Sequence, residues 1–144
     1  MKKYNIRVYA LIIHKGKILV TDEFRGNMRM TKFPGGGNEW GEGLIETLKR
    51  ECVEELAQEP VSIEHFYTTD FFVASAFNSN DQMISVYYKV SIPYPEKIEV
   101  VQNEFDFPEE KDGAQIFRWL EIDRIHPDQF TFPIDKKVAG LLRK

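Results

Sequence analysis

Residues 34–58 read PGGGNEWGEGLIETLKRECVEELAQ, and this stretch decides the fold. From Leu44 onward, apolar residues recur every three or four positions, which is the period of an α-helix with one buried face. The glycines before the helix are typical of a tight turn. The stretch therefore predicts a Gly-rich turn followed by a short helix from Leu44, with Pro60 as a possible stop.

Three glutamates share one edge of this predicted helix. At about 100° per residue, Glu54 and Glu55 fall roughly 60° and 40° to either side of Glu51. On a solvated face, a like-charge pair costs only about 0.2–0.5 kcal/mol, and most acidic helix faces are of that kind. Beside a buried stripe, charges about 5.5 Å apart repel by roughly 3 kcal/mol at an effective dielectric near 20. We therefore expect a cation beside these carboxylates.

Carboxylate oxygens are hard ligands, so the expected cation is Mg²⁺, with Mn²⁺ as a substitute. The sequence lacks the EF-hand pattern, in which acids or Asn alternate before a glycine. His14, His65 and His126 stand singly, without the short spacing of a metal-binding pair. Cys52 lies in the apolar ridge of the helix, where we expect it to pack against the core and not to react.

The stretch resembles the signature of the Nudix hydrolases, G-x5-E-x7-R-E-U-x-E-E-x-G-U, with U an aliphatic residue. The positions that match at the required separations are Gly36, Glu42, Arg50, Glu51, Glu54 and Glu55. Two positions depart, because Ala57 replaces the Gly and Gln58 replaces the last aliphatic residue. Since Gly would supply a left-handed turn there, we expect an altered helix exit and an unchanged carboxylate edge.

The resemblance implies an α/β (α+β) fold, a Nudix-like α/β/α sandwich around a mixed β-sheet. It also implies a MutT-like pyrophosphohydrolase, which cleaves a nucleoside diphosphate derivative, NDP-X, to NMP and phosphorylated X with a metal-activated water. By position, the catalytic residues would be Glu51, Glu54 and Glu55, and these would bind the metal together with the backbone at Gly36. Glu42 would brace the helix through Arg50.

A diphosphate presents dense negative charge to an attacking water, so cations are needed to neutralise it. Among basic residues, Arg7 and Lys32 are the first candidates for substrate binding, followed by Arg25 and Arg29. Family members often use a further acid from outside the signature. Our candidates for it, in an acidic segment after Val101, are Glu104 and Glu109.

Length and composition predict one domain over residues 1–144, since 144 residues with 42% hydrophobic content can bury a core. The net charge of −4 argues against stable nucleic-acid binding. A single cysteine suits a reducing compartment, and no stretch approaches the roughly 20 apolar residues of a membrane span. We expect a cytoplasmic protein with a small-molecule, nucleotide-type substrate, and leave a homodimer open.

Periodicity also predicts the other elements of the chain. The predicted strands are 4–13, 17–24, 61–77, 82–92 and 115–120, with a second helix at 134–142 and a turn at 122–125.

Two other functions fit the same sequence. A Nudix-like module could bind a nucleotide or metabolite without cleaving it, although such a sensor could discard the metal ligands, which this chain keeps. An interaction domain with an acidic helix face would show no metal dependence. Substrate identity is open among nucleotide sugars, dinucleoside polyphosphates and damaged dNTPs. Three aromatic residues could stack on a base, namely Phe24, Phe71 and Phe77, but aromatic residues on strands are more often found in the core.

Overall fold

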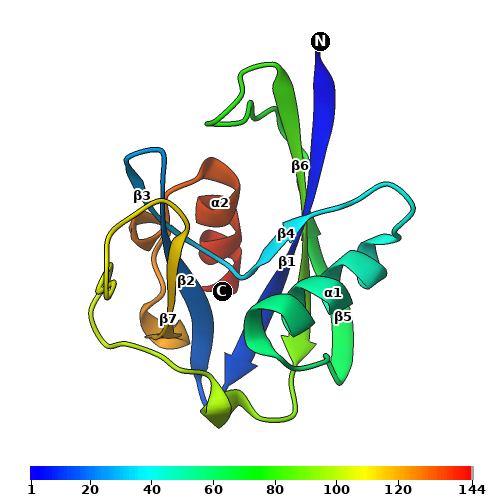
Figure 1. The fold of residues 1–144 in the computed structure, drawn as a ribbon. Helices are drawn as coiled ribbons and strands as arrows, with labels where there is room; N and C mark the ends of the chain where they lie inside the picture. Colours follow the sequence, from blue (N-terminus) through cyan, green and yellow to red (C-terminus); the bar gives the residue numbers. More distant parts are fainter. Residues whose placement is uncertain (144) are drawn as a thin grey trace. The chain divides into compact units, whose positions relative to one another are not determined.

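The computed structural model describes residues 1–143. The chain divides into two compact units, which we describe separately (Figure 1). The first unit combines Met1–Leu11 with Pro34–Pro93, and the second combines Ile12–Phe33 with the chain from Tyr94 onward. No helix within residues 1–143 is both long and apolar enough to span a lipid bilayer.

The first unit holds most of strand β1 and the helix predicted from the Gly-rich stretch. Its elements are β1 (Lys3–His14), which continues into the second unit, β4 (Gly35–Gly37), α1 (Leu44–Leu56), β5 (Ser62–Thr68) and β6 (Asp81–Ser91). β4 pairs antiparallel with β1, so that Gly36 lies opposite Val8. β5 pairs antiparallel with β6, with a register shift between His65 and Tyr67.

The core of the first unit forms where α1 packs beside β4. Val8 and Ala10 of β1 are buried, and the apolar stripe of α1 places Leu48 and Cys52 among the buried residues. Gly35 is the position where the close approach of β4 to β1 requires a glycine. Its φ is +151°, and a Cβ there would overlap the backbone of β1. The Gly-rich turn therefore allows β4 to lie directly on β1 ahead of the helix.

The helix exit differs from the expectation at Ala57. Ala57 adopts the left-handed conformation, with φ 57° and ψ 30°, and its N–H donates to the carbonyl of Val53 at 3.0 Å. The altered exit that we expected is therefore wrong, because the chain keeps the left-handed turn without the glycine. A non-Gly residue held in this conformation costs about 1–2 kcal/mol.

Replacing Ala57 by Gly should relieve that strain. We expect Ala57→Gly to raise the free energy of unfolding by about 1 kcal/mol, because the relief exceeds the extra freedom that Gly gives the unfolded chain. Urea titration measures this change. Lys49→Gly, at an exposed position inside α1, is the control and should destabilise by a similar amount. If Ala57→Gly and Lys49→Gly lowered the free energy of unfolding equally, the backbone of Ala57 would not be strained.

The second unit is built around strand β2. Its elements are β2 (Lys17–Arg25), β3 (Met28–Lys32), β7 (Ala114–Glu121), α2 (Pro133–Leu142) and the 3-10 turns η1 (Pro95–Lys97), η2 (Ile122–Arg124) and η3 (Pro127–Gln129). β2 pairs antiparallel with both β3 and β7. The rings of Phe33 and Phe130 stack with centroids 4.6 Å apart.

A buried ion pair sits in the middle of β2. Arg118 of β7 donates to both carboxylate oxygens of Asp22, from Nε at 2.6 Å and from Nη2 at 2.9 Å. The Thr31 hydroxyl and the Phe105 backbone N–H also donate to this carboxylate, at 2.7 and 3.0 Å. Asp22 is fully buried, so these four hydrogen bonds replace its lost hydration.

The strand order is β3-β2-β1-β6-β5, with β4 paired to β1 and β7 paired to β2. Besides the antiparallel pairs, Val100 makes a parallel bridge to Phe117. Within residues 1–143, seven strands and two helices form an α+β fold with a mixed sheet, which confirms the expected fold class. The single domain over residues 1–144 stays a prediction.

Most predicted elements lie within one or two residues of the observed ones, but the strand predicted for 61–77 is too long. β5 ends at Thr68, and beyond it only an isolated bridge joins Ala74 to Gln82. The reason lies at Thr69, whose hydroxyl donates to the Ser85 carbonyl and accepts from the Ser85 N–H. A side-chain oxygen thus accepts the Ser85 N–H in place of the Thr69 carbonyl, although the Thr69 N–H still donates to the Ser85 carbonyl at 3.0 Å. The short strands β3 and β4 were not predicted.

Candidate functional site

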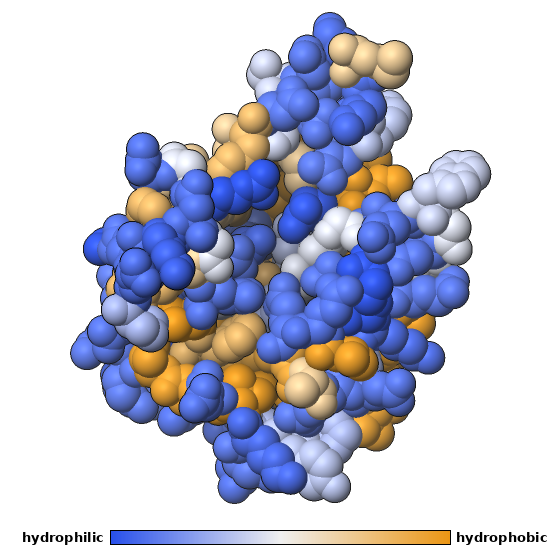
Figure 2. Space-filling model, viewed as in Figure 1, coloured by the Kyte–Doolittle hydropathy of each residue, from blue (hydrophilic) through white to orange (hydrophobic). Residues whose placement is uncertain are grey.

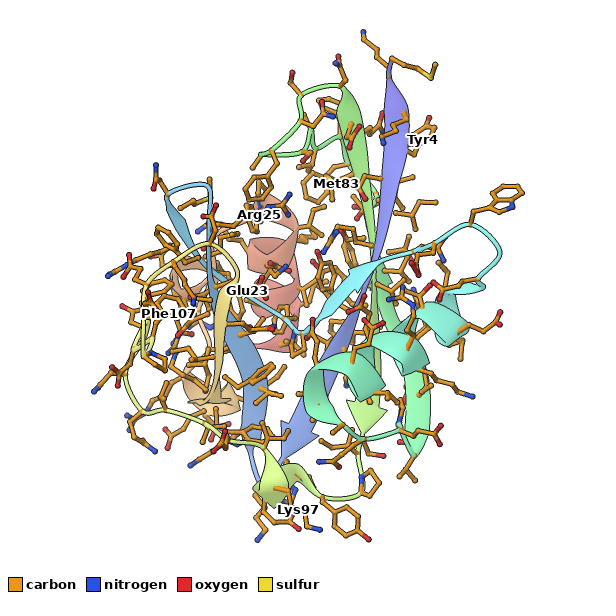
Figure 3. All side chains as sticks on the ribbon, in the orientation of Figure 1. Tyr4, Glu23, Arg25, Met83, Lys97 and Phe107 are labelled. Carbon is orange, nitrogen blue, oxygen red and sulfur yellow. The ribbon has the colours of Figure 1, made fainter. Side chains whose placement is uncertain are left out.

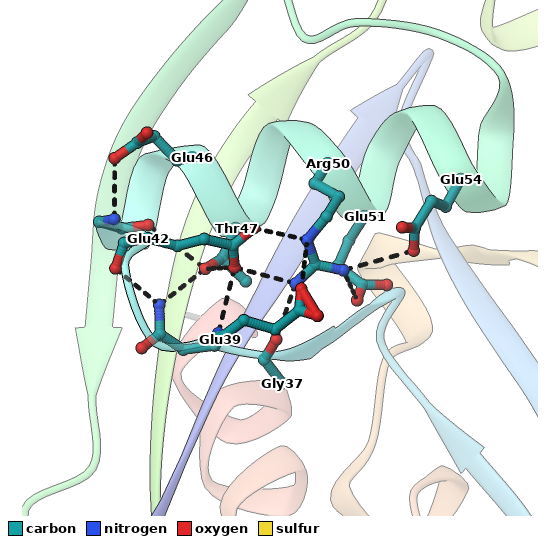
Figure 4. A network of polar contacts seen from close by, with 10 residues as sticks. Gly37, Glu39, Glu42, Glu46, Thr47, Arg50, Glu51 and Glu54 are labelled. Atoms are coloured by element: carbon teal, nitrogen blue, oxygen red, sulfur yellow. Dashed lines mark hydrogen bonds and ion pairs between the residues drawn. The ribbon is translucent and has the colours of Figure 1, made fainter.

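Arg50 of α1 lies at the centre of a network of carboxylates (Figure 4). Its Nε donates to Glu42 at 2.6 Å, and its Nη2 donates both to Glu42 at 3.0 Å and to the Gly37 carbonyl at 2.9 Å. Its Nη1 contacts Glu51 at 2.9 Å and Glu54 at 3.4 Å. One guanidinium therefore ties the Gly-rich strand, the turn before α1 and two of the helix glutamates together.

Glu42 is held in place by the turn that leads into α1. Besides Arg50, its carboxylate accepts from the Thr47 hydroxyl at 2.9 Å and from the Glu39 N–H at 3.1 Å. Asn38 donates to the Thr47 hydroxyl at 2.8 Å. Glu46, which Arg50 could also have reached on α1, instead accepts from the Gly43 N–H at 2.8 Å.

These contacts shift two pKa values. Hydrogen bonds from Arg50, with smaller contributions from Thr47 and Glu39, lower the pKa of Glu42 to about 2. The same bond to Glu42 raises the pKa of Arg50 further above its usual range, with Glu51 adding to the effect. Both groups therefore stay charged across the physiological pH range.

The low pKa of Glu42 gives a pH-dependent contribution to stability. Because its folded pKa lies below the ordinary 4.5, the contribution is present above about pH 4.5 and is lost as pH falls through about 2. We expect Glu42→Gln to lower the urea midpoint of unfolding at pH 7. The difference in midpoint between this variant and the wild type should become smaller as the pH falls below 4.5. Glu39→Gln is the control, since Glu39 lies 3.3 Å from Arg50 but is exposed. A difference in urea midpoint that does not change with pH would contradict the lowered pKa of Glu42.

Glu51 lies directly against the Gly-rich strand. A Cβ placed on Gly36 would overlap its carboxylate, with Oε2 only 2.8 Å away. The Glu51 side chain is 13% exposed, whereas that of Glu54 is 57% exposed. The missing side chain at Gly36 thus makes room for Glu51 to reach Arg50, while Glu54 approaches the same Nη1 atom from solvent. The surface over α1 is largely hydrophilic (Figure 2).

Glu55 lies on the other side of Glu51, toward the core. It lines a small hollow between α1 and the Gly-rich segment together with Ala10, Gly35 and Cys52, and its Oε2 is shielded from solvent. Burial raises the pKa of the Cys52 thiol to about 12, and the charges of Glu55 and Glu51 add to this shift. Cys52 is therefore a protonated packing residue at neutral pH.

The oxygens around Arg50 suit a divalent cation in kind and charge. Glu51 and Glu54 already converge on one positively charged nitrogen, and carboxylate oxygens are ligands that Mg²⁺ prefers. Within residues 1–143, however, no three His, Cys, Asp or Glu side chains are grouped as a ready metal site. The present contacts therefore bring two of the three predicted ligands to one point and place Glu55 in the adjoining hollow.

Arg7 is the predicted substrate-binding residue that lies in the same unit. It stands opposite Gly37 in the β1–β4 pairing, and a Cβ on Gly37 would be 3.6 Å from its Nη1. Its Nε donates to the Tyr9 hydroxyl at 2.8 Å, and the guanidinium lies 5.8 Å from the centre of the Tyr9 ring. Because Gly37 has no side chain, the Arg7 guanidinium can lie beside it. Tyr9 orients this guanidinium, and the carbonyl of the same Gly37 binds Arg50.

The other predicted residues belong to the second unit and make local contacts there. Lys32 pairs with Glu23 at 3.3 Å, and Arg29 binds Glu110 and lies over the Phe105 ring. Arg25 ends β2 and is labelled with Glu23 in Figure 3. Of the two candidate acids, Glu104 is exposed, and Glu109 is exposed and pairs with Lys111 at 3.4 Å.

Sequence reasoning missed Asn38, Glu39 and Thr47, which hold Glu42 and Arg50 in place. Thr47 offered a signal, because it lies between Leu44 and Leu48 on the side of α1 that the apolar stripe buries. A buried hydroxyl needs a partner, and Glu42 is the nearest acid in the sequence. Asn38 and Glu39 lie in a turn whose path could not be inferred from the sequence.

Comparisons with known proteins bear on the family and the fold of the chain. The sequence profile of a family described as NUDIX domain matches residues 3–140. No curated protein matches the sequence.

Solved structures match the fold at low sequence identity. A NUDIX hydrolase from Nitrosomonas europaea is 22% identical with a TM-score of 0.68, over 96% of this chain and 87% of that one. A MutT NUDIX hydrolase from Burkholderia pseudomallei is 16% identical with a TM-score of 0.68, over all of both chains. A protein described as an ADP compounds hydrolase is 17% identical with a TM-score of 0.62, over 96% of this chain and 70% of that one.

Proposed function

Because the chain belongs to the NUDIX family and is a Nudix pyrophosphohydrolase, we propose that it cleaves the diphosphate linkage of NDP-X compounds with a metal-activated water. Water adds to one phosphorus, the bridging P–O bond breaks, and NMP and phosphorylated X are released. The observation that carries the proposal is the convergence of Glu51 and Glu54 on one nitrogen of Arg50 beside the Gly-rich strand.

We assign the metal-binding role to Glu51, Glu54, Glu55 and the backbone at Gly36. When bound, Mg²⁺, or Mn²⁺ in its place, supplies positive charge to the diphosphate and lowers the pKa of water. Glu51 is the residue assigned to accept the proton of the attacking water. Its partial burial and its contact with Arg50 hold the carboxylate in one orientation, while Glu42 keeps Arg50 in place from the other side.

We assign binding of the phosphates first to Arg7. Its guanidinium is oriented by Tyr9 and lies over Gly37, one residue from the position that Glu51 contacts. Lys32, Arg25 and Arg29 remain proposed substrate-binding residues, as do Glu104 and Glu109 as the further acid. The fold's similarity to an ADP compounds hydrolase fits the NDP-X class but leaves X unspecified.

The proposal includes a cytoplasmic enzyme that acts as one domain over residues 1–144 on a small nucleotide-type substrate. The single cysteine fits a reducing compartment, and the acidic balance of charge fits a protein that does not bind nucleic acid stably. A homodimer is compatible with the proposal but is not needed by it.

A substrate panel tests the proposed reaction. Nucleotide sugars, dinucleoside polyphosphates and oxidised dNTPs are incubated with the full chain in Mg²⁺, in Mn²⁺ and in EDTA, and released NMP, pyrophosphate and orthophosphate are measured. We expect NMP from at least one NDP-X compound in Mg²⁺ and a loss of at least about 100-fold in EDTA, because the carboxylates alone cannot neutralise a diphosphate. Turnover that is unchanged by EDTA would contradict the metal assignment.

A further inference from the structure

A second pocket of the first unit lies at the start of β1, outside the segment that pairs with β4. Its volume is about 340 Å³, within the range of small-molecule sites. Its lining includes Lys2, Lys3, Tyr4, Phe72, Asn80 and Asp81. Val8 is the residue of β1 that pairs with Gly36. Tyr4 lies four residues before Val8, which is about 13 Å along the strand. The pocket is therefore separate from the carboxylates of α1.

Backbone hydrogen bonds fix the walls of this pocket. The Lys3 N–H donates to the Asn80 carbonyl at 3.1 Å, which joins the start of β1 to the turn before β6. Within that turn, the Asp81 N–H donates to the Asn78 carbonyl at 2.9 Å, and the Asp81 carbonyl accepts from Ser75 at 2.9 Å. Figure 3 shows Tyr4 on β1 and Met83 on the neighbouring β6. The backbone around the pocket is thus held in place by hydrogen bonds.

Two aromatic side chains of the lining are largely exposed. Tyr4 is 64% exposed and Phe72 is 72% exposed, although each would gain by leaving water. Lys2, just before β1, and Lys3, its first residue, are also part of the lining. A flat ring with a negatively charged substituent matches both features, because the ring can stack on the aromatics and the charge can pair with ammonium groups.

The pocket also contains an acid whose hydrogen bonding is incomplete. Asp81 is only 7% exposed, and its Oδ1 is shielded from solvent and has no hydrogen-bond partner among residues 1–143. Nor does Asp81 take part in any ion pair found among these residues. A buried carboxylate oxygen without a donor is costly, so rotation of the Asp81 side chain that brings this oxygen to the N–H group of a ligand in the pocket would be favoured.

We propose that this pocket is a second nucleotide-binding site. The base stacks on Tyr4 and Phe72, an N–H group on the edge of the base donates to Asp81, and the phosphate pairs with Lys2 and Lys3. Bases that carry an amino group suit the carboxylate best, because uracil flanks its one N–H with two carbonyl oxygens that the carboxylate repels. The site binds without cleaving, since the glutamates of α1 are not part of its lining.

Calorimetric titration of the full chain with AMP, CMP and UMP tests the proposal. The titrations are done in EDTA, so that binding through the proposed catalytic metal does not contribute. We expect AMP and CMP to bind more tightly than UMP, and Tyr4→Ala and Phe72→Ala each to weaken binding by about tenfold. Trp40→Ala is the matched control, because Trp40 is fully exposed and is not part of the pocket lining. It should leave the affinity unchanged.

Further variants separate this site from the proposed active site. Asp81→Asn, which keeps the shape of the side chain, should reduce the preference for AMP over UMP. Lys49→Ala, at an exposed position of α1 outside the pocket lining, should not change binding in EDTA. The site is overturned if ribose 5-phosphate binds as tightly as AMP, if no nucleotide binds at millimolar concentration, or if the aromatic variants change only self-association. None of these results depends on turnover, so the proposed hydrolysis stands or falls separately.

Discussion

Glu51→Gln should lower turnover of the substrate found in the panel by roughly 10²–10⁴-fold while the protein remains folded. The amide keeps the shape of the side chain but removes both the negative charge offered to the metal and the ability to accept a proton. Its position adds to the effect, because the carboxylate is held between Gly36 and Arg50 in one orientation. Steady-state rates with saturating Mg²⁺ measure the loss.

Two matched substitutions complete this test. Glu54→Gln should also remove most of the activity, although Glu54 is more exposed, because it approaches the same Nη1 atom of Arg50. Glu59→Gln changes an exposed acid just beyond α1 and should retain wild-type turnover. Circular dichroism and the urea midpoint check that each variant is folded. Near-wild-type rates for Glu54→Gln would contradict its assignment as a metal ligand.

The parts of the fold that could be predicted depend on local patterns. The apolar spacing of α1 predicted its start, and the spacing of Arg50 from Glu54 placed the two within contact on one helix. The match to the Nudix signature predicted that Glu42 would contact Arg50, a pair eight residues apart that no helical period joins. Local patterns and one family signature were therefore sufficient for the centre of the candidate site.

The parts that could not be predicted depend on partners distant in the sequence. Gly36 lies next to Glu51 only because β4 pairs with β1, and a three-residue strand of glycines has no alternating pattern to reveal it. The Asp22–Arg118 pair joins residues 96 apart. Nothing near Asp22 in the sequence indicates that it is buried. Such residues become visible only when the pairing of the strands is known.

Asp22→Ala should destabilise the protein by about 3–5 kcal/mol, because it leaves the Arg118 guanidinium buried without its partner. The substitution also leaves the Thr31 hydroxyl and the Phe105 N–H without their acceptor. We expect the melting temperature to fall by roughly 8–15 °C, as measured by calorimetry. Asp22→Asn should cost less than Asp22→Ala, since the amide oxygen can still accept from one of these donors.

The double variant Asp22→Leu/Arg118→Leu distinguishes the two origins of this loss. If the cost of Asp22→Ala comes mainly from the unpaired cation, removing both charges should recover much of the stability, because two apolar side chains can replace a buried ion pair at little net cost. The hydrogen bond to the Phe105 N–H would still be missing, so recovery should be incomplete. Arg124→Leu, which breaks an exposed pair with Glu121, should change stability by less than about 1 kcal/mol. A double variant as unstable as Asp22→Ala would show that Asp22 stabilises the fold through its neutral donors and not through Arg118.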